Sequence, residues 1–353
     1  MTAPKSFKID KTTPVMVTGA TGYVAGELIK QLLGAGIRVH AAVRNPDATA
    51  KIAHLNAMEG ADANLKLFKA DLLVEGSYAE AMAGCGTVFH TASPFTTNIK
   101  DPQRDMVDPA LKGTENVLNS VAQTGSVKRV VLTSSCVAIY GDALDIAAYP
   151  GGVMTEAQWN HSSTLNHQTY SYSKTVAEKR AWEMAKSQDQ YKLVVINPGF
   201  ILGPGTMDNP TSESFSLIRQ MIDGTMRMGA PDFDIGCVDV ADVALAHIRA
   251  AYTPEAEGRH ITVGEGKTFL DLAADIRAER PNLPTPKSAI PKWLLKIIGP
   301  LINQTMTRKM LDRNIGHPWR FDNTKAKAAL GMEFRPVAPA VVAMADQILA
   351  KKA

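Results

Sequence analysis

The chain has 353 residues, of which 45% are hydrophobic and 21% are charged, and its formal net charge is +3. These values are typical of a soluble globular protein, and the absence of long runs of one charge argues against binding to nucleic acid. Three cysteines, Cys85, Cys136 and Cys237, are far apart and odd in number, which predicts free thiols and a reducing, cytoplasmic location.

The chain shows no segment that we expect to target it to a membrane. Its first residues, MTAPKSFKIDKTTP, are polar and lack the apolar core of a signal peptide. The most apolar stretch, residues 290–302, is interrupted by Lys292, Lys296, Gly299 and Pro300. It is too short and too interrupted to span a bilayer, so we expect a buried helix or an interface.

Between residues 15 and 197, short β-branched runs alternate with segments of helical period. The expected strands are VMVT, RVHAAV, LKLFKA, TVFHTA, RVVLTSS and KLVVIN, and the main helices are expected at 23–33, 109–123 and 171–186. This alternation predicts an α/β protein with a Rossmann-type doubly wound parallel sheet.

After residue 197 the pattern loosens into segments rich in proline, glycine and methionine. A strand near 234–238 and a helix at 240–251 are expected to return to the main sheet. We therefore predict a Rossmann domain at 12–204, with 234–263 returning to it. Residues 205–233 and 264–353 are expected to form a smaller C-terminal α/β substrate-binding cap.

The first expected strand leads into a glycine-rich turn, TGATGYVAG, and then into an amphipathic helix. Gly19 would permit a tight turn, Gly22 would let the backbone approach a pyrophosphate, and Ala25 would let the helix pack on its strand. The helix N-terminus would present free N–H groups and a positive dipole end to phosphates. This arrangement predicts dinucleotide binding, with candidate contacts at Gly19, Thr21, Gly22, Tyr23 and Val24.

The second expected strand ends at Arg44, where an NAD site normally carries an acidic side chain for the adenosine ribose. A guanidinium at this position suits a 2′-phosphate, and Lys51 could add a second positive charge. The alternative is that both are solvated surface cations. The pattern favours NADP(H) over NAD as the cofactor.

The fifth expected strand ends in Thr133, Ser134 and Ser135, at the edge of the sheet where doubly wound folds bind ligands. Further along, Tyr170 and Lys174 have the i and i+4 spacing that places two side chains on one helical face. A free phenol titrates near about 10, but a neighbouring ammonium and an oxidised nicotinamide would favour the phenolate. Ser135 would donate to a substrate oxygen as negative charge develops there. Lys174 would also hold the nicotinamide ribose.

Taken with the segments LTSS, YSYSKTVAE and INPGFILGP, these motifs carry a family resemblance. From about residue 14 to the C-terminus, the chain resembles an extended short-chain dehydrogenase/reductase of the dihydroflavonol reductase, cinnamoyl-CoA reductase and aldehyde reductase group. The resemblance implies that Tyr170 is the proton donor or acceptor, with Ser135 and Lys174 in the roles given above. It also implies cofactor contacts along the edge of the sheet, from Asp71 and Leu72 at the adenine, Thr91, Ala92 and Ser93 at the phosphates and ribose, and Pro198, Gly199, Phe200 and Ile201 at the nicotinamide.

Two departures from the family patterns bear on the substrate. Tyr140 lies five residues after Ser135, where flavonoid reductases carry an asparagine, and the segment before Tyr170 lacks the tryptophan of cinnamoyl-CoA reductases. Both disfavour those substrates. His161 and His167 are expected at the surface or at a pocket rim, and the reaction requires no metal.

We therefore expect a monomeric or homodimeric enzyme that uses NADPH to reduce a small apolar or aromatic aldehyde or ketone, reversibly. One alternative is a nucleotide-sugar epimerase or dehydratase, and another is a flavonoid or CoA-thioester reductase on the same fold. A third is a non-catalytic protein that senses NADP, which would have no need of the Ser135, Tyr170 and Lys174 set.

Overall fold

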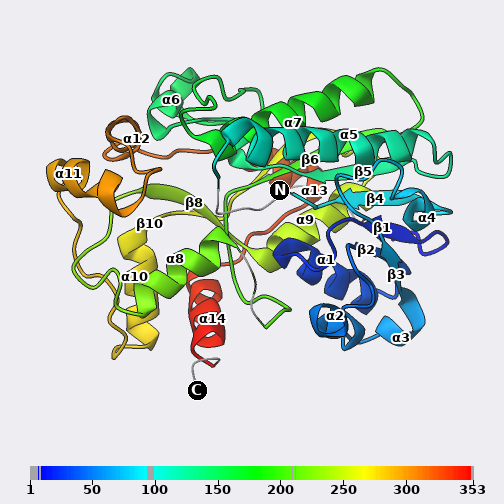
Figure 1. Ribbon diagram of the computed structural model, residues 1–353, viewed down its shortest axis with the longest axis horizontal. Coiled ribbons are helices and arrows are strands. Elements are labelled where there is room, and N and C mark those ends of the chain that lie inside the picture. The colour runs from blue at the N-terminus through cyan, green and yellow to red at the C-terminus, as the bar shows by residue number, and fades with distance from the viewer. Residues whose placement is uncertain (1–6, 8, 94–98, 209, 211, 351–353) are drawn as a thin grey trace.

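The computed structural model describes residues 7, 9–93, 99–208, 210 and 212–350. Its central sheet has seven parallel strands in the order β3-β2-β1-β4-β5-β6-β9 (Figure 1). The strands are β1 (Val15–Val17), β2 (Val39–Val43), β3 (Leu65–Lys69), β4 (Thr87–His90), β5 (Arg129–Thr133), β6 (Lys192–Pro198) and β9 (Gly258–Thr262). The predicted Rossmann-type sheet is confirmed, with its strand order reversing between β1 and β4.

Six of these strands are the ones expected from the sequence, and β9 is the one that was missed. Its sequence, GRHIT, carries Arg259 and His260, which are polar residues in a buried strand at the end of the sheet. Arg259 is tolerated there because it pairs with the buried Glu178 at 2.7 Å. A long-range pair of this kind is invisible to a local pattern of hydrophobic residues.

Helices cover both faces of the sheet (Figure 1). On one face, α1 (Tyr23–Gly34) packs against α9 (Val240–Tyr252), and on the other α5 (Asp108–Ala122) packs against α7 (Thr169–Lys186). Strand β1 shows the alternation that divides the two cores, because Val15 and Val17 join one cluster and Met16 joins the other. The three main helices predicted from the sequence are confirmed as α1, α5 and α7, with ends shifted by one or two residues.

Shorter segments complete this part of the molecule. They are α2 (Thr49–Asn56), α3 (Ala61–Asn64), α4 (Ala79–Met82), the π-helix η1 (Gln103–Val107), the 3₁₀ helices η2 (Cys136–Ala138) and η3 (Pro150–Gly152), and α13 (Thr324–Leu330). Helix α13 packs against α9 and β9. It is therefore an exception to the cap predicted for residues 264–353.

A second, smaller sheet has the order β10-β8-β7, formed by β7 (Phe200–Leu202), β8 (Asp234–Asp239) and β10 (Glu265–Thr268). Its core is shared with α8 (Glu213–Ile222), α10 (Phe269–Glu279) and α14 (Val337–Leu349). The expected return of strand 234–238 to the main sheet is wrong, because β8 pairs with β7 and β10 while β6 pairs with β9. The rest of the segment expected to return does so, because α9 packs on the main sheet and β9 joins it beside β6.

Three helices lie together at one end of the molecule, namely α6 (Ala143–Ala147), α11 (Lys292–Ile302) and α12 (Arg308–Asn314) (Figure 1). Leu295 of α11 is buried in a cluster with Leu311 and Ile315. The opposite side of α11 is open, with Trp293 65% and Leu301 85% exposed. The expectation of a buried helix here is therefore wrong for that side.

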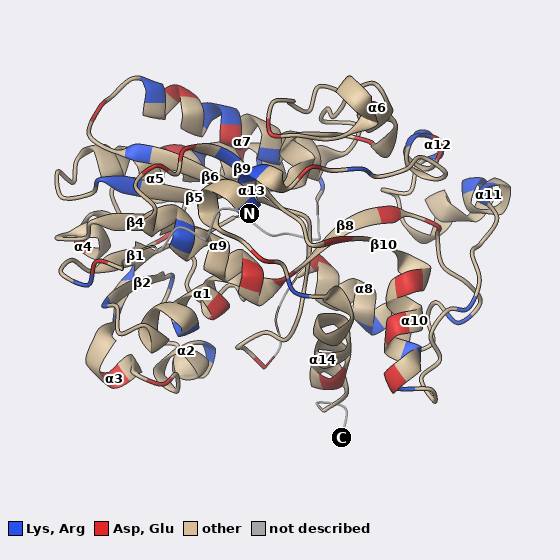
Figure 2. Cartoon of the chain, turned by 180° about the vertical axis from the view of Figure 1, so that it is seen from behind, with Lys and Arg blue, Asp and Glu red and all other residues tan. Residues whose placement is uncertain are grey.

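Charged residues are distributed widely over the molecule. In Figure 2, Lys and Arg lie on α2, α5, α7 and α10, interspersed with Asp and Glu, and they do not gather on one face in that view. Among the helices that the structure describes, none combines the length and apolar character needed to cross a lipid bilayer. The N-terminal segment expected to be an untargeted tail falls largely on residues 1–6 and 8, outside the described part.

Candidate active site

The glycine-rich turn follows β1 directly, and its first glycine, Gly19, packs so closely that there is no room for a side chain. Gly19 has φ 62°, in the left-handed region, and a Cβ built on it would lie 3.0 Å from the Cα of Ala92. The Gly22 N–H donates to the Gly19 carbonyl at 2.8 Å and closes the turn. No side chain caps α1, and its first turn contains no acidic residue. Its N-terminus therefore offers backbone donors and a positive dipole end to an anion.

The turn is fixed to the end of β4 by Thr18, a residue that the sequence analysis did not single out. The Thr18 Oγ1 accepts from the N–H groups of Thr91 at 3.0 Å and Ala92 at 2.9 Å. The same hydroxyl lies 3.0 Å from Nδ1 of His90, so its own proton goes to that nitrogen. Burial, followed by the charge of Lys174, lowers the pKa of His90 to about 3. This histidine is therefore a neutral structural partner under the phosphate turn.

Two positively charged side chains, Arg44 and Lys51, lie after the carboxyl end of β2. Arg44 follows β2 and Lys51 lies in α2, and their exposed side chains make no hydrogen bond or ion pair to any described residue. Asp71 and Leu72 follow β3, and Asp71 Oδ1 accepts from the Leu73 N–H at 2.9 Å, so this carboxylate shapes its own loop. The structure therefore leaves Arg44 and Lys51 available to an anionic ligand.

The segments that carry the predicted catalytic residues lie together, because η2, which follows Ser135, packs against α7. Ser135 precedes η2, and Tyr170 and Lys174 occupy the first turns of α7. Tyr170 as a residue is 46% exposed, and burial of its phenol, followed by the carboxylate of Glu213, raises its pKa to about 12. Burial lowers the pKa of Lys174 to about 8, against the opposing effect of Glu178. At neutral pH the phenol is protonated and the amine is largely charged.

Of the three hydroxyl groups at the end of β5, only that of Ser135 is left with a proton to donate outward. The buried Ser134 donates to Glu178 Oε2 at 2.5 Å. Thr133 donates to Nε2 of His247 at 2.6 Å, because Nδ1 of that histidine is used on the Val243 carbonyl. Ser135 Oγ accepts from the Val137 N–H at 3.3 Å, which leaves its O–H free.

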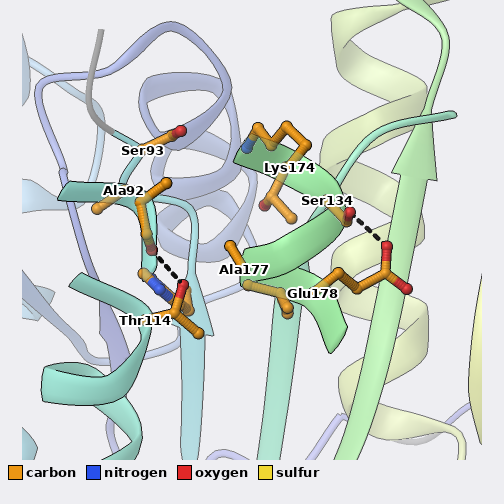
Figure 3. Close-up of a pocket in the computed structure, with 11 residues that line it drawn as sticks. Ala92, Ser93, Thr114, Ser134, Lys174, Ala177 and Glu178 are labelled. Atoms are coloured by element: carbon orange, nitrogen blue, oxygen red, sulfur yellow. Dashed lines mark hydrogen bonds between the residues drawn. The ribbon is translucent and has the colours of Figure 1, made fainter. Parts of the chain in front are cut away.

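Glu178 is a second functional candidate that the sequence analysis missed. It lies one turn after Lys174 on α7 and is 1% exposed. Beyond Ser134 and Arg259, it accepts from Nδ2 of Asn197 at 2.9 Å. Figure 3 shows Lys174, Ser134 and Glu178 lining one small pocket beside Ala92 and Ser93. The buried carboxylate therefore lies one turn from Lys174, the predicted catalytic lysine, and connects α7 to β6 and β9.

The turn after β6 brings the small sheet to this site. A Cβ built on Gly199 would lie 2.3 Å from the Gly236 carbonyl oxygen, so only glycine permits this approach of β6 to β8. Phe200 and Ile201 follow in β7 and are half-buried. The phenol of Tyr23 donates to the Gly203 carbonyl at 2.7 Å. Any cofactor contact from Tyr23 would therefore come from its backbone.

Two residues near the departures from the family patterns have clear structural roles, namely Tyr140 and, in the segment before Tyr170, His167. Tyr140 packs edge-on against Trp319, with ring centroids 5.5 Å apart, and Trp319 packs against Phe321 at the same separation. Burial raises the pKa of Tyr140. His167 is buried and binds Asp142 through Nε2 at 2.8 Å, so the expectation of a surface or rim position for it is wrong. His161 is exposed, as expected.

Comparisons with known proteins show which proteins this chain resembles. A model of the NAD dependent epimerase/dehydratase family matches residues 15–264. Cinnamoyl-CoA reductase 1 of Petunia hybrida is 39% identical over 328 residues, which cover 92% of this chain and 88% of that protein.

Solved structures are similar over nearly the whole chain. Gre2 from Candida albicans, in complex with NADPH, matches with a TM-score of 0.78 and 28% identity over 96% of this chain and 99% of that one. The yeast methylglyoxal/isovaleraldehyde reductase Gre2, complexed with NADPH, matches with a TM-score of 0.79 and 26% identity over the same shares.

Proposed function

This chain belongs to the NAD dependent epimerase/dehydratase family, and on that premise we propose that it is an NADPH-dependent reductase that converts an aldehyde or ketone into an alcohol, reversibly. The observation that carries the proposal is the pairing of Tyr170 and Lys174 on α7 with Ser135, the one hydroxyl at the end of β5 that is free to donate. These groups lie at the edge of the sheet that also carries the glycine-rich turn.

The cofactor-binding residues fit NADP(H). Gly19 leaves no room for a side chain against Ala92, and the uncapped start of α1 suits the pyrophosphate, through the N–H groups of residues 21–24. Arg44 and Lys51 suit the 2′-phosphate, which distinguishes NADP from NAD. The two Gre2 reductases with similar structures are NADPH complexes. We assign the remaining contacts to Asp71, Leu72, Thr91, Ala92, Ser93, Pro198, Gly199, Phe200 and Ile201.

The catalytic step divides among three side chains, and bound NADPH supplies the hydride. Tyr170 donates its phenolic proton to the carbonyl oxygen, which becomes the alcohol hydroxyl. Ser135 donates a hydrogen bond to the same oxygen while negative charge builds up on it. The ammonium of Lys174 stabilises the phenolate that remains on Tyr170 after the proton has left. Glu178 keeps Lys174 charged by raising its pKa against the effect of burial.

The substrate is a small apolar or aromatic carbonyl compound, taken from the side of the smaller sheet. We assign the cap to residues 205–233 and 264–353 without α13, together with β7 and β8 of the smaller sheet, and the Rossmann domain to 12–198 with α9 and β9. The half-buried Phe200 and Ile201, in β7 of the smaller sheet, offer apolar surface on that side. Each buried methylene contributes about 0.8 kcal/mol. A phenyl aldehyde should therefore have a KM at least about tenfold lower than a C2 aldehyde.

A second candidate is reduction of an aromatic acyl-CoA thioester to the aldehyde, with release of the free thiol. It is favoured by the 39% identity to a cinnamoyl-CoA reductase. It is disfavoured by the segment before Tyr170, in which His167 and Gln168 are followed by Thr169 with no tryptophan.

One assay panel separates these reactions. NADPH consumption is measured with phenyl, C2 and branched aldehydes and with cinnamoyl-CoA, and a thiol reagent detects released CoA. Turnover of the aldehydes without thiol release supports our proposal. Turnover restricted to the thioester supports the second candidate, and conversion of a UDP-sugar without net NADPH consumption would make the chain an epimerase or dehydratase.

A further inference from the structure

A buried polar cluster lies between the catalytic helix and α12. We call it the Asp142 cluster, and its members are Asp142, Asp145, His167, Arg313 and Asn314. Asp142 and Asp145 belong to the start of α6, and their side chains are 0% and 4% exposed. Arg313 and Asn314 are the last two residues of α12. The cluster therefore joins a segment that begins at Ser135 to a helix from the C-terminal part of the chain.

Within the cluster, the guanidinium of Arg313 donates two hydrogen bonds, one to each of the two aspartates. Arg313 donates from Nε to Asp142 at 2.5 Å and from a terminal nitrogen to Asp145 at 2.6 Å. Asn314 donates to the other Asp142 oxygen at 2.7 Å and accepts from the Ala143 N–H at 2.9 Å. Burial works to raise the pKa of Asp142, but hydrogen bonds, with that of His167 the largest, outweigh it and lower the pKa. The carboxylate is therefore charged and directionally held.

On its other side, Asp142 holds the turn that starts α7. It binds Nε2 of His167 at 2.8 Å and Nε2 of Gln168 at 3.3 Å. Gln168 has φ 55° and ψ 51° and is the only non-glycine residue with positive φ in the described part of the chain. Such a conformation persists only where the surroundings impose it. Tyr170 follows two residues later, so this turn aims the first turn of α7 and its phenol.

The same region is tied to the segment of Ser135. Asn160 donates to the Val137 carbonyl at 2.8 Å, and Ser162 donates to Asp145 at 2.5 Å. The loop that leads to Tyr170 and the segment that follows Ser135 are therefore fastened to each other next to the Asp142 cluster.

We propose that Asp142 and Arg313 are positioning residues for proton transfer by Tyr170, acting through the left-handed turn at Gln168. This inference rests on the proposed function. Without the two hydrogen bonds from Arg313, the Asp142 carboxylate is no longer held in place, and the turn at Gln168 relaxes. The phenol of Tyr170 then shifts relative to the substrate oxygen. A displacement of about 1 Å in a reacting group costs about 10²-fold in rate. The turn at Gly19 and the start of α1 lie outside the cluster, so binding of NADPH is unaffected.

The test compares Arg313→Met and Arg313→Lys with a matched control, Arg280→Met. Arg280 also makes a two-bond ion pair in the C-terminal part of the chain, to Asp346 at 2.8 and 2.6 Å, but far from α7 in the fold. We expect Arg313→Met to lower kcat by about 10- to 100-fold, with the KM for NADPH changed less than about twofold. Arg313→Lys keeps the charge without the fork geometry and should fall in between. Arg280→Met should keep kcat within about twofold of the wild type.

A second measurement does not depend on turnover. Hydrogen–deuterium exchange of the full chain with NADP⁺ present should become faster at residues 165–173 in Arg313→Met and stay unchanged at residues 23–34. The inference is overturned if Arg313→Met and Arg280→Met lose the same activity. It is also overturned if kcat falls without faster exchange at 165–173, or if the KM for NADPH rises in parallel. If Arg313→Met does not fold, the same criteria apply to Arg313→Lys.

A parallel Tyr170→Phe variant separates this inference from the proposed function. If Tyr170→Phe retains turnover, the proposed function fails. If Tyr170→Phe is inactive while both Arg313 variants match the wild type, the proposed function stands and only the positioning role fails.

Discussion

Replacement of two adjacent serines by alanine should give opposite results. Ser134 is buried and its hydroxyl donates at 2.5 Å to Glu178, a carboxylate that is 1% exposed. Ser135 is half-buried, and the only bond its Oγ makes to a described residue is one accepted from the Val137 N–H at 3.3 Å. Ser134→Ala should therefore damage stability, and Ser135→Ala should damage catalysis.

The magnitudes follow from these partners. A hydrogen bond to a charged group contributes about 1.5–3 kcal/mol. In a chain of this length about 1 kcal/mol corresponds to about 2 °C, so Ser134→Ala should lower Tm by about 3–6 °C. Its kcat should remain within about threefold of the wild type, because the donor to the substrate is intact. Ser135→Ala should lower kcat by about 10²–10³-fold while leaving Tm within about 1 °C.

The assay measures kcat from NADPH consumption with a phenyl aldehyde, and Tm by calorimetry of the same preparations. The reasoning is refuted if Ser134→Ala loses the rate at unchanged Tm while Ser135→Ala keeps it. That outcome would assign the substrate hydrogen bond to Ser134 and would show that its bond to Glu178 is not kept in the working enzyme.

Three further predictions concern the proton donor, the cofactor and the buried carboxylate. Tyr170→Phe should lose more than about 90% of kcat with little change in NADPH affinity, measured by fluorescence titration, because only the proton is removed. Arg44→Asp should weaken NADPH binding at least about tenfold and spare NADH, since it removes a charge-assisted bond worth about 1.5–3 kcal/mol; equal loss of both cofactors would make Arg44 a structural residue. Glu178→Gln should shift the alkaline fall of kcat/KM to lower pH, because Glu178 raises the pKa of Lys174 and activity is lost as pH rises through that pKa, about 8 in the wild type. An unmoved profile would disconnect the two groups.

The sequence predicted those parts of the fold that depend on local patterns. The six strands from β1 to β6 and the helices α1, α5 and α7 follow from runs of β-branched residues and from helical periodicity. The glycine-rich turn was predictable because its motif, TGATGYVAG, lies directly between the first strand and an amphipathic helix. Each of these signals lies within about ten residues of chain.

The features that were missed depend on contacts between distant segments. Strand β9 has a polar sequence that is compatible with burial only because Arg259 finds Glu178 on α7. Strand β8 was placed in the wrong sheet because the sequence of a six-residue strand does not indicate which strand it will pair with. His167 was expected at the surface because its partner, Asp142, lies 25 residues earlier in the chain. Buried polar pairs are therefore where local pattern reasoning fails in this protein.

The pKa values of Tyr170 and Lys174 indicate which protonation states are populated before any ligand binds. Reduction needs a protonated phenol, and the surroundings of Tyr170 raise its pKa to about 12, so the donor is fully loaded at neutral pH. Oxidation of an alcohol needs the phenolate, which the protein alone does not stabilise at that pH. The positive charge of an oxidised nicotinamide and the ammonium of Lys174 would both lower this pKa. The oxidative rate should therefore keep rising with pH until Lys174 loses its proton near its pKa of about 8, whereas the reductive rate should be flat below it. A rising oxidative rate beside a flat reductive rate below about pH 8, measured on one preparation, follows from a single phenol that serves as acid in one direction and base in the other.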